Sequence, residues 1–464
     1  MHPEETSPLP PPGAVADRRA ANFLNFLKSV GVPAVPTQMT FGISRDGGLF
    51  EWAGTGLDAV FCQRKNLLSR RMWRMLFDVV RFNQFALDLL IHEPRLGMAQ
   101  ETIGEYLVRE GYSDGFRDDY LMPMTAAVWS TDPDKCALEF PATTLVRFLY
   151  ESPPRPARFS RCLHGFRWNH HLLSTVARRP DWLTIPTGSQ SYIDAVLRHV
   201  PPDHVLLNSP VHSVCNEPDG RVRIQMDGGR SAVYDHVIIA THGDQAYSLV
   251  EASATPDETA ILSQFQTSEN TAVLHSDLSL MPVSRKAWSS WNYLMLSPGV
   301  AGAEGAGRVS LTYNMNILQH IPEGTFGDVL VTLNPLHEPD ADTVQGRYTY
   351  RHPLYNAAAV AAQNLLPSIQ NTRGISYAGA WTKYGFHEDG FSSGLECARD
   401  YLGASPPLDF VDSTFSRGRR PVLGLTDWLL RVVILLIQTF VVKLAGGVEA
   451  AARRVRSVRK DKGA

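Results

Sequence analysis

The chain has 464 residues, of which 44% are hydrophobic and 20% are charged, so it has the composition of a folded globular protein with room for two or three domains. Its 44 basic and 47 acidic residues give a formal net charge of −3, which excludes a whole-molecule electrostatic attraction to nucleic acid. The five cysteines form no Cys-x-x-Cys pair, which argues against a disulfide framework or a thiolate metal site and favours a reducing, intracellular compartment.

The N-terminal region predicts a disordered start followed by a helix. Residues 1–16 are acidic and rich in proline, and they lack the basic start and apolar run of a secretory signal. Asp17 can cap a helix whose apolar positions recur at helical spacing until Gly31 ends it.

A β-hairpin and a long run of helices are predicted next. Residues 38–44 and 49–52 form the hairpin, because an Asp-Gly-Gly turn joins two β-prone stretches. Apolar residues at helical spacing predict a long amphipathic helix over 72–90, and the pattern stays mostly helical from 101 to 150.

Residues 155–180 are predicted to form a loop-rich bridge that contains three histidines. Adjacent His170 and His171 cannot both point to one face of a helix, and neither an H-E-x-x-H motif nor a further ligand lies nearby. We therefore predict no metal site.

Short strands dominate the next stretch. The order strand, glycine turn, helix is expected over 182–200. The strand ending in Ile-Ile-Ala is apolar throughout, which predicts that both of its faces are covered, and the ligands of open α/β sheets lie just outside such strand ends. Five strands are predicted in all, at 205–208, 211–215, 222–226, 231–234 and 237–240.

A second, antiparallel sheet is predicted between residues 271 and 350. Its clearest strands are 288–294, 309–315 and 329–334, and a helix over 356–366 follows them.

Residues 375–402 predict a strand, a glycine-broken loop and then a helix from Ser392 onward. The N-terminus of such a helix offers free N–H groups and a positive dipole end to an anionic ligand. The stretch also contains Gly390-Phe391-Ser392-Ser393-Gly394, the pattern of a hydrolase nucleophile elbow. That fold needs its acid and its histidine after the serine, and the last histidine of this sequence, His387, comes before it, so serine hydrolysis is not predicted.

The C-terminal tail combines an apolar segment with a basic cluster. Residues 423–444 are rich in apolar side chains, but charged and polar residues leave only 432–442 uninterrupted, which is too short for a spanning helix of roughly 20 residues. We expect residues 422–462 to attach to an intracellular membrane surface or barely span it, with the basic tail on the cytoplasmic side; the alternative is a soluble docking helix. The basic residues are Arg453, Arg454, Arg456, Arg459, Lys460 and Lys462.

Several stretches, in their order along the chain, resemble the flavin-dependent amine-oxidase-like family, and most closely its uncharacterised NAD/FAD-binding subfamily. Similarity runs from about residue 22 to 402, and the matches are jointly specific although each alone is weak. The stretches are V-P-T-Q-M-T-F-G-I-S (35–44), Q-R-K-N-L-L (63–68), L-M-P-M-T-A-A-V-W-S (121–130), P-V-H-S-V (210–214), D-H-V-I-I-A (235–240), A-W-S-S-W-N-Y (287–293), T-Y-N-M-N (312–316) and Y-A-G-A-W-T-K-Y-G-F-H-E-D-G (377–390).

The resemblance implies an α/β fold with an incomplete doubly wound FAD-binding domain, an α+β substrate domain that contains the antiparallel sheet, and a C-terminal apolar helix. The FAD-binding parts would be about 17–37, 182–260 and 367–404, and the substrate domain about 38–181 and 261–366. Residues 405–464 would form the linker, the membrane-associating helix and the basic tail.

The family resemblance also assigns roles to residues. Those implied to contact FAD are Val211, Ala240, Gly379, Ala380, Gly390, Phe391 and Ser392. The candidate catalytic residues are Trp381, Tyr384 and His387, and those expected on the substrate side are Trp291, Tyr293 and Asn314. For each aromatic residue the alternative is core packing, and for His387 it is loop hydrogen bonding.

One element that the resemblance leads us to expect is absent from the sequence. Relatives begin with a strand, a G-x-G-x-x-G turn and a helix, and no such motif occurs here. Two hypotheses follow. The first is an FAD-dependent oxidoreductase, present here as a truncated form, that takes a hydride from a C–N or C–C bond of a small or lipid-like molecule. The second is a non-catalytic, membrane-associated remnant or scaffold that cannot hold FAD.

Overall fold

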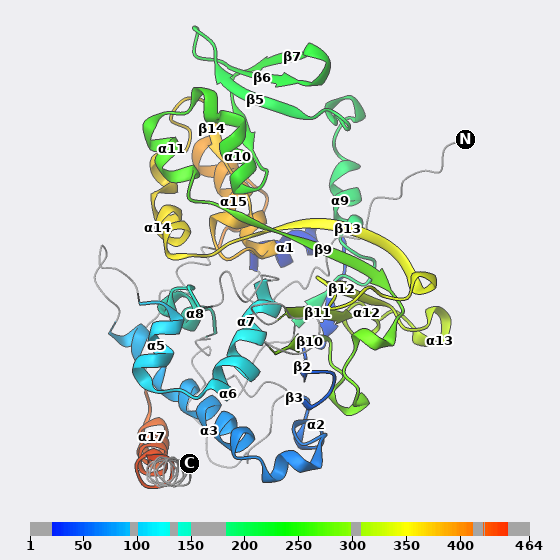
Figure 1. The fold of residues 1–464 in the computed structure, drawn as a ribbon. Coiled ribbons are helices and arrows are strands. Elements are labelled where there is room, and N and C mark those ends of the chain that lie inside the picture. The colour runs from blue at the N-terminus through cyan, green and yellow to red at the C-terminus, as the bar shows by residue number, and fades with distance from the viewer. Residues whose placement is uncertain are drawn as a thin grey trace, which may run out of the picture.

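The computed structural model describes residues 21–92, 101–129, 138–149, 182–297, 308–411, 421 and 423–443. The predicted disordered start, the histidine-containing bridge and the basic cluster lie outside these residues. Figure 1 shows two parts: one is built around a seven-stranded sheet, and the other around a short parallel strand pair with a three-stranded sheet above it.

The seven-stranded sheet has the strand order β13, β9, β12, β11, β10, β2, β3. Neighbouring strands are antiparallel except β10 and β2, which are parallel. The predicted hairpin is confirmed, since Ile43 lies opposite Trp52, and the second, antiparallel sheet is confirmed as well. The strands are β2 Phe41–Arg45, β3 Phe50–Ala53, β9 Thr267–His275, β10 Trp291–Leu296, β11 Arg308–Asn314, β12 Leu330–Leu333 and β13 Val344–Pro353.

A group of helices packs against β2, β3 and β10. Trp52 and Met75 are fully buried between them, and burying one such side chain stabilises the fold by about 1.5–3 kcal/mol. The single helix predicted over 72–90 is wrong in one respect: it breaks into α3 and α4, at the turn where the Gln84 carbonyl accepts a hydrogen bond from the Arg431 guanidinium. The helices are α2 Leu57–Val60, α3 Arg70–Phe85, α4 Asp88–Ile91, α5 Ile103–Glu110, α6 Asp114–Phe116, α7 Met122–Trp129 and α8 Ala142–Leu149.

The other part is centred on β8 (Val237–Ile239) and β14 (Ile375–Tyr377), which pair in parallel. The prediction that both faces of β8 are covered is wrong, because the Ile238 side chain is 39% exposed. Among the residues that the structure describes, this parallel sheet has two strands, so a larger doubly wound sheet is not formed by them. Around the pair lie α10 Gly243–Val250, α11 Pro256–Leu262, α14 Ala357–Leu365 and α15 His387–Glu396.

The three-stranded antiparallel sheet consists of β5 Val211–Asn216, β6 Val222–Met226 and β7 Ser231–Tyr234. The strand predicted at 205–208 is wrong. Two successive prolines start a 3-10 turn there, Pro202–His204, and Asn208 adopts the left-handed conformation with φ of 51°. A strand cannot continue through these backbone angles.

Two N-terminal elements connect the parts. Helix α1 (Ala21–Ser29) ends just before Gly31, as predicted, and packs beside α9 (Gln190–Leu197). Strand β1 (Val35–Thr37) pairs with β4 (Trp182–Thr184). The short helices α12 (Met315–Leu318) and α13 (Glu323–Phe326) lie between strands of the large sheet in the sequence.

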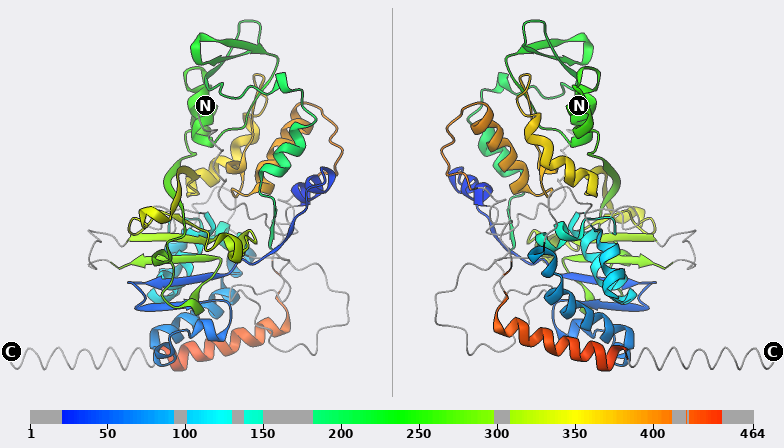
Figure 2. Two further views of the ribbon diagram at one scale, coloured as in Figure 1. Left: turned by 90° about the vertical axis from the view of Figure 1, so that its right-hand side faces the viewer. Right: turned by 90° about the vertical axis from the view of Figure 1, so that its left-hand side faces the viewer.

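The last helix, α17 (Leu425–Ile437), lies along the base of the molecule next to α3 (Figure 2). A π-helical stretch, Gln438–Lys443, continues it. Within the described ranges, no helix combines the length and the apolar character that crossing a membrane requires.

Candidate functional site

The carboxyl ends of β8 and β14 meet at one edge of the parallel pair, where ligands of α/β proteins bind. The backbone N–H of Ala378 donates to the Ile239 carbonyl over 3.0 Å, and the Trp381 indole N–H donates to the Thr241 carbonyl over 2.9 Å. These bonds fix the two strand ends relative to each other. Ala240, at the end of β8, is exposed, so it presents backbone and a methyl group to the outside.

Gly379 makes the sharp turn that follows β14. Its φ is 149°, and an added Cβ atom would lie 2.5 Å from the Trp381 indole nitrogen and 3.2 Å from the Thr241 carbonyl oxygen. Its N–H donates to the Ser393 hydroxyl over 2.8 Å, which ties the turn to α15. A glycine is therefore required here both by conformation and by space.

Helix α15 begins at His387, so the prediction that it begins at Ser392 is wrong. The Asp389 carboxylate accepts hydrogen bonds from the backbone N–H groups of Tyr384 (3.2 Å) and Phe386 (3.1 Å), and this cap starts the helix before Gly390. Gly390 lies inside the helix, where an added Cβ would be 3.6 Å from Ala380. The glycine permits close packing rather than opening a helix N-terminus at that point.

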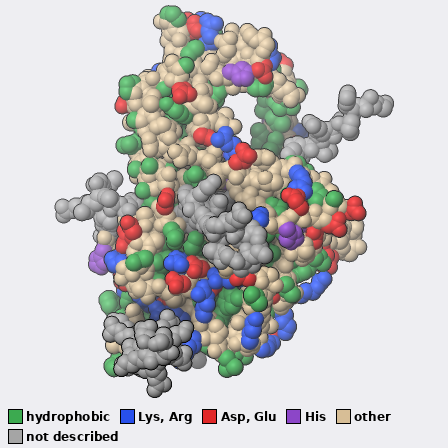
Figure 3. Space-filling model, in the orientation of Figure 1, with side chains coloured by type: hydrophobic (Ala, Val, Ile, Leu, Met, Phe, Trp, Pro, Cys, Tyr) green, Lys and Arg blue, Asp and Glu red, His purple; other side chains and the backbone are tan. Residues whose placement is uncertain are grey.

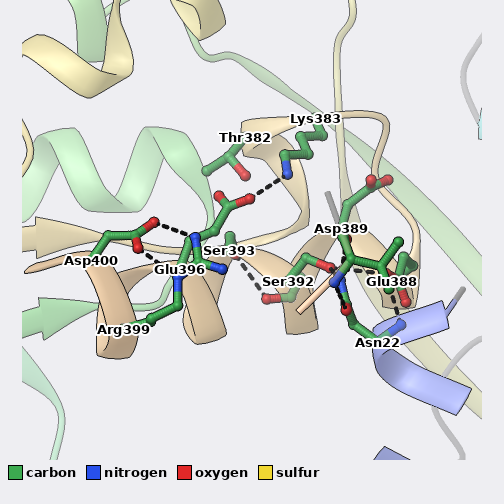
Figure 4. Close-up of polar contacts among 12 residues, drawn as sticks. Asn22, Thr382, Lys383, Glu388, Asp389, Ser392, Ser393, Glu396, Arg399 and Asp400 are labelled. Atoms are coloured by element: carbon green, nitrogen blue, oxygen red, sulfur yellow. Dashed lines mark hydrogen bonds and ion pairs between the residues drawn. The ribbon is translucent and has the colours of Figure 1, made fainter. Parts of the chain in front are cut away.

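A buried polar cluster joins α15 to α1 (Figure 4). The Glu388 carboxylate accepts from the backbone N–H groups of Phe23 (2.8 Å) and Asn22 (3.3 Å), and from the Ser392 hydroxyl (3.0 Å). The Asn22 amide donates in turn to the Ser392 hydroxyl over 2.9 Å. Ser392, the serine of the hydrolase-like pattern, is thus a fully buried structural residue on a helix.

Two of the proposed site residues belong to an aromatic cluster between α1, α9 and α15. The ring of Phe391 stacks on Phe26 with centroids 4.7 Å apart, and the His387 ring lies 5.5 Å from Phe23 and 6.4 Å from Tyr192. Burial lowers the pKa of His387 from its ordinary 6.5, so its imidazole is neutral at pH 7. It can accept or donate a hydrogen bond without carrying charge.

The other two proposed catalytic residues lie in different surroundings. Trp381 is buried in the core beside Phe265, with ring centroids 4.5 Å apart in an edge arrangement. The ring of Tyr384 lies 6.2 Å from Phe148 of α8, so it sits where the two parts of the molecule meet. Of the proposed three, Tyr384 and His387 flank the α15 N-terminus, while Trp381 packs beneath the Gly379 turn.

The proposed substrate-side residues lie on the large sheet. The Trp291 ring packs edge-on against Tyr313, with centroids 6.1 Å apart, and Tyr293 is buried against the helices. The Asn314 side chain caps α12 by accepting from the Ile317 N–H over 3.2 Å. Val211 opens β5 opposite Met226. The structure therefore brings Gly379, Ala380 and Gly390 together, and places Trp291, Tyr293, Asn314 and Val211 on other strands.

Sequence reasoning missed Tyr355. Its side chain is 4% exposed, and its hydroxyl finds no hydrogen-bond partner among the described residues. The hydroxyl lies beside the Gly385 turn, 2.5 Å from where a Cβ of that glycine would be. Burial and the nearby Asp389 carboxylate hold the pKa of Tyr355 well above 10, so it stays a neutral donor. No local pattern in the sequence marks this tyrosine.

An opening passes through the upper part of the molecule in Figure 3, below β5 and between α10 and α9. The Arg351–Asp244 ion pair lies in the region of α10 and β13, and Asp244 also accepts from the Thr267 hydroxyl over 2.7 Å. The opening is adjacent to the part of the fold that contains the β8 and β14 ends.

Residues 137–276 match the family model described as flavin containing amine oxidoreductase. Over these residues the chain is similar to the flavin amine oxidases. No curated protein matches this amine-oxidase-like chain in sequence. The matched family is a flavin-containing one, which agrees with FAD as the expected cofactor.

Solved structures share the fold of the amine-oxidase-like chain at low sequence identity. Cyclohexylamine oxidase from Brevibacterium oxydans IH-35A has a TM-score of 0.52 at 12% identity, covering 84% of this chain and 88% of its own. A CLA-producing fatty acid isomerase from P. acnes has a TM-score of 0.52 at 11% identity, covering 84% and 86%. Reduced UDP-galactopyranose mutase has a TM-score of 0.51 at 14% identity, covering 90% and 87%. At these identities the similarity establishes a mixed α/β fold with several sheets.

Proposed function

We propose that this protein is an FAD-dependent oxidoreductase that oxidises a C–N or C–C bond of a small or lipid-like molecule. The observation that carries the proposal is the parallel β8–β14 pair, whose carboxyl ends lead into the tight Gly379 turn against α15, in a chain that matches a flavin-containing family over 137–276. The names of two neighbours, a cyclohexylamine oxidase and a putrescine oxidase, support an amine substrate. The fatty acid isomerase supports a lipid-like one.

The residues at these strand ends fit one portion of FAD. Exposed Ala240 and half-exposed Gly379 and Ala380 present backbone and small side chains, which lets a planar ring or its sugar-alcohol chain approach closely. The Tyr355 hydroxyl, near the same loop, is a buried donor that has no hydrogen-bond partner within the described part of the chain. These residues would hold the cofactor by shape and by backbone contacts.

The α15 N-terminus fits a phosphate poorly. Its first turn carries Glu388 and Asp389, both buried, and the Asp389 carboxylate already occupies the backbone N–H groups that precede the helix. Negative side chains at this end repel a phosphate that a helix N-terminus would otherwise attract. The pyrophosphate of FAD would therefore depend on other groups.

When bound, FAD would supply the hydride-accepting chemistry. The residues of this chain would orient the substrate and exclude water. Tyr384 lies where the two parts meet, and neutral His387 lies beside the aromatic cluster between α1, α9 and α15; either could position a substrate amine by hydrogen bonding. Trp291, Tyr293 and Asn314 remain the predicted substrate-side residues on the large sheet.

A second candidate function is a non-catalytic, membrane-associated scaffold. Two observations favour it: the sequence contains no G-x-G-x-x-G turn, and the parallel sheet of the described region has two strands. A protein of this kind would keep the fold without retaining FAD.

Flavin binding separates the two candidates. The full chain is purified, its absorption spectrum is recorded, and binding of added FAD is measured by fluorescence quenching. Ala240→Trp should weaken FAD binding by about tenfold or more, since it places an indole on the proposed site without disturbing the core. Ser231→Trp, at an exposed position on β7, is the matched control and should bind like the unmodified chain. A folded, colourless protein that ignores added FAD would refute the oxidoreductase and favour the scaffold.

A further inference from the structure

Helix α17 has an inverted burial pattern, with a buried charged residue and exposed apolar residues. An ordinary surface helix turns its charged side chains to water and its apolar side chains to the protein. In α17 the charged Arg431 is only 5% exposed, whereas the apolar Leu425 and Leu429 are 77% and 59% exposed. The exposed apolar side chains of this segment are Leu425, Trp428, Leu429, Leu430, Val432, Val433, Leu435, Leu436, Ile437 and Phe440, which we call the α17 apolar face.

A narrow strip attaches α17 to the rest of the protein. The Arg431 guanidinium pairs with the Asp88 carboxylate over 2.8 Å and donates to the Gln84 carbonyl, and it lies 5.0 Å from the ring centroid of Phe85. Ile434, one turn later on the same side of the helix, is 2% exposed. Arg431 therefore holds the middle of the helix against the end of α3, and the apolar face points away.

We propose that the α17 apolar face binds, parallel to the surface, to a lipid bilayer that contains anionic headgroups. A contiguous group of ten large apolar side chains exceeds what a soluble surface ordinarily leaves exposed. Because Arg431 fixes the helix centre to the protein, α17 cannot turn upright into the hydrocarbon without breaking the partly buried Arg431–Asp88 ion pair and the bond to the Gln84 carbonyl. Half-exposed Trp428 is of the type that sits at the level of the headgroups.

The charge of the segment after α17 favours a bilayer over a second copy of the chain as the binding partner of the α17 apolar face. The sequence that follows α17 contains six basic residues between 453 and 462 against the single acid Asp461, a balance of 6 − 1 = +5. A second copy of the chain has the same excess of positive charge in this part of its sequence, so it offers no opposite charge to these residues. An anionic membrane surface attracts both of the features that α17 and its following segment offer, the apolar face and the positive charge.

The placement of α17 sets the orientation of the protein on the membrane. Figure 2 shows α17 along the base of the molecule, and in Figure 1 the β8–β14 region lies at the opposite end. The helices α3 and α4 would therefore face the bilayer, and the strand ends of the candidate flavin site would lie on the far side. Arg431 is the positioning residue that fixes this geometry.

Vesicle flotation tests the proposal on the full chain. Phosphatidylcholine vesicles with and without phosphatidylserine are the two probes, and binding should be stronger with phosphatidylserine and should weaken as salt is raised. Leu429→Asp combined with Leu436→Asp places two charges on the α17 apolar face and should lower binding by about tenfold or more. Leu207→Asp combined with Phe326→Asp, at positions 78% and 66% exposed away from α3, α4 and α17, is the matched control and should bind like the unmodified chain.

Three results would overturn the proposal. One is binding that is equal for both vesicle types at all salt concentrations, a measurement that needs no variant. Another is equal loss of binding in the α17 and control pairs. The third is sedimentation showing a dimer that the α17 substitutions dissociate, with no vesicle binding by the unmodified chain, which would make the face a self-association surface. Circular dichroism of each variant confirms that it folds.

Discussion

Replacing Glu388 with alanine tests how α1 is held against α15. Its carboxylate accepts from the N–H groups of Phe23 and Asn22 at the start of α1 and from Ser392 in its own helix. A hydrogen bond to a charged acceptor contributes about 1.5–3 kcal/mol net. Desolvation disfavours the ionised carboxylate and raises the pKa of Glu388, which offsets part of the gain from these three hydrogen bonds. We therefore expect Glu388→Ala to lose about 3 kcal/mol in total, which corresponds to one strong and one weak hydrogen bond.

The effect should be local to α1, so hydrogen exchange is the suitable assay. A loss of about 3 kcal/mol corresponds to roughly 100-fold faster exchange of the amide hydrogens of residues 21–29. Mass spectrometry measures this exchange. Glu388→Gln keeps one acceptor oxygen and should cause about half of the loss in free energy. Glu396→Ala, on the same helix but in a partly exposed pair with Lys383, is the control and should cost no more than about 1 kcal/mol. Exchange of α1 that changes less than twofold in Glu388→Ala would refute this account of the cap.

Three further perturbations have defined outcomes. Burial lowers the pKa of His275 to about 4, so between pH 4 and 6.5 the unfolded chain binds more protons than the folded one, and the free energy of unfolding should rise with pH. His275→Gln should reduce the slope of this free energy against pH by the equivalent of up to one proton, as measured by urea unfolding at several pH values. An unchanged slope would contradict this expectation. Arg373→Met leaves the fully buried Glu258 without its cation and should cost about 3–5 kcal/mol. A second change, Glu258→Gln, removes the charge but keeps acceptor capacity for the Thr255 N–H and the Tyr377 hydroxyl, so it should restore a large share; an equal loss in the double variant would show that the pair is not coupled. Tyr355→Phe removes a buried hydroxyl without a protein partner in the described region and should be neutral or stabilising by up to about 1 kcal/mol in thermal melts without FAD, whereas a clear loss would reveal a partner.

The elements that sequence reasoning predicted well are those whose signals are local. Turn residues mark the ends of β5, β6 and β7, so these strands lie within one residue of their predicted positions. An Asp-Gly-Gly turn marks the β2–β3 hairpin, whose strands lie within three residues of theirs. The predicted start of α15 was wrong because the three glycines of the segment indicated a loop up to Gly390, whereas the cap formed by Asp389 starts the helix earlier. Asp389 binds N–H groups that precede it, and that bond depends on how the loop closes rather than on composition.

The candidate site was predictable only in part, because its parts come from distant segments. The glycine turn at 379 and the end of β8 follow from apolar runs and turn residues. That Ser392 serves as a partner of Asn22 depends on a contact across 370 positions, and no local pattern encodes it. The inward direction of Arg431 depends in the same way on Asp88, which lies 343 residues earlier.

The bond between Phe23 and Glu388 has a consequence for biosynthesis, because it spans 365 residues of the chain. At a translation rate of about 5–20 residues per second, the ribosome needs roughly 20–70 s to make the partner of α1 after α1 itself has emerged. During that interval Phe23 and Leu27, which are buried in the finished protein, have no α15 to cover them. Helix α1, the first helix in the described part of the chain, is therefore among the last to reach its final position, and it is a natural binding segment for a chaperone while the rest is being made.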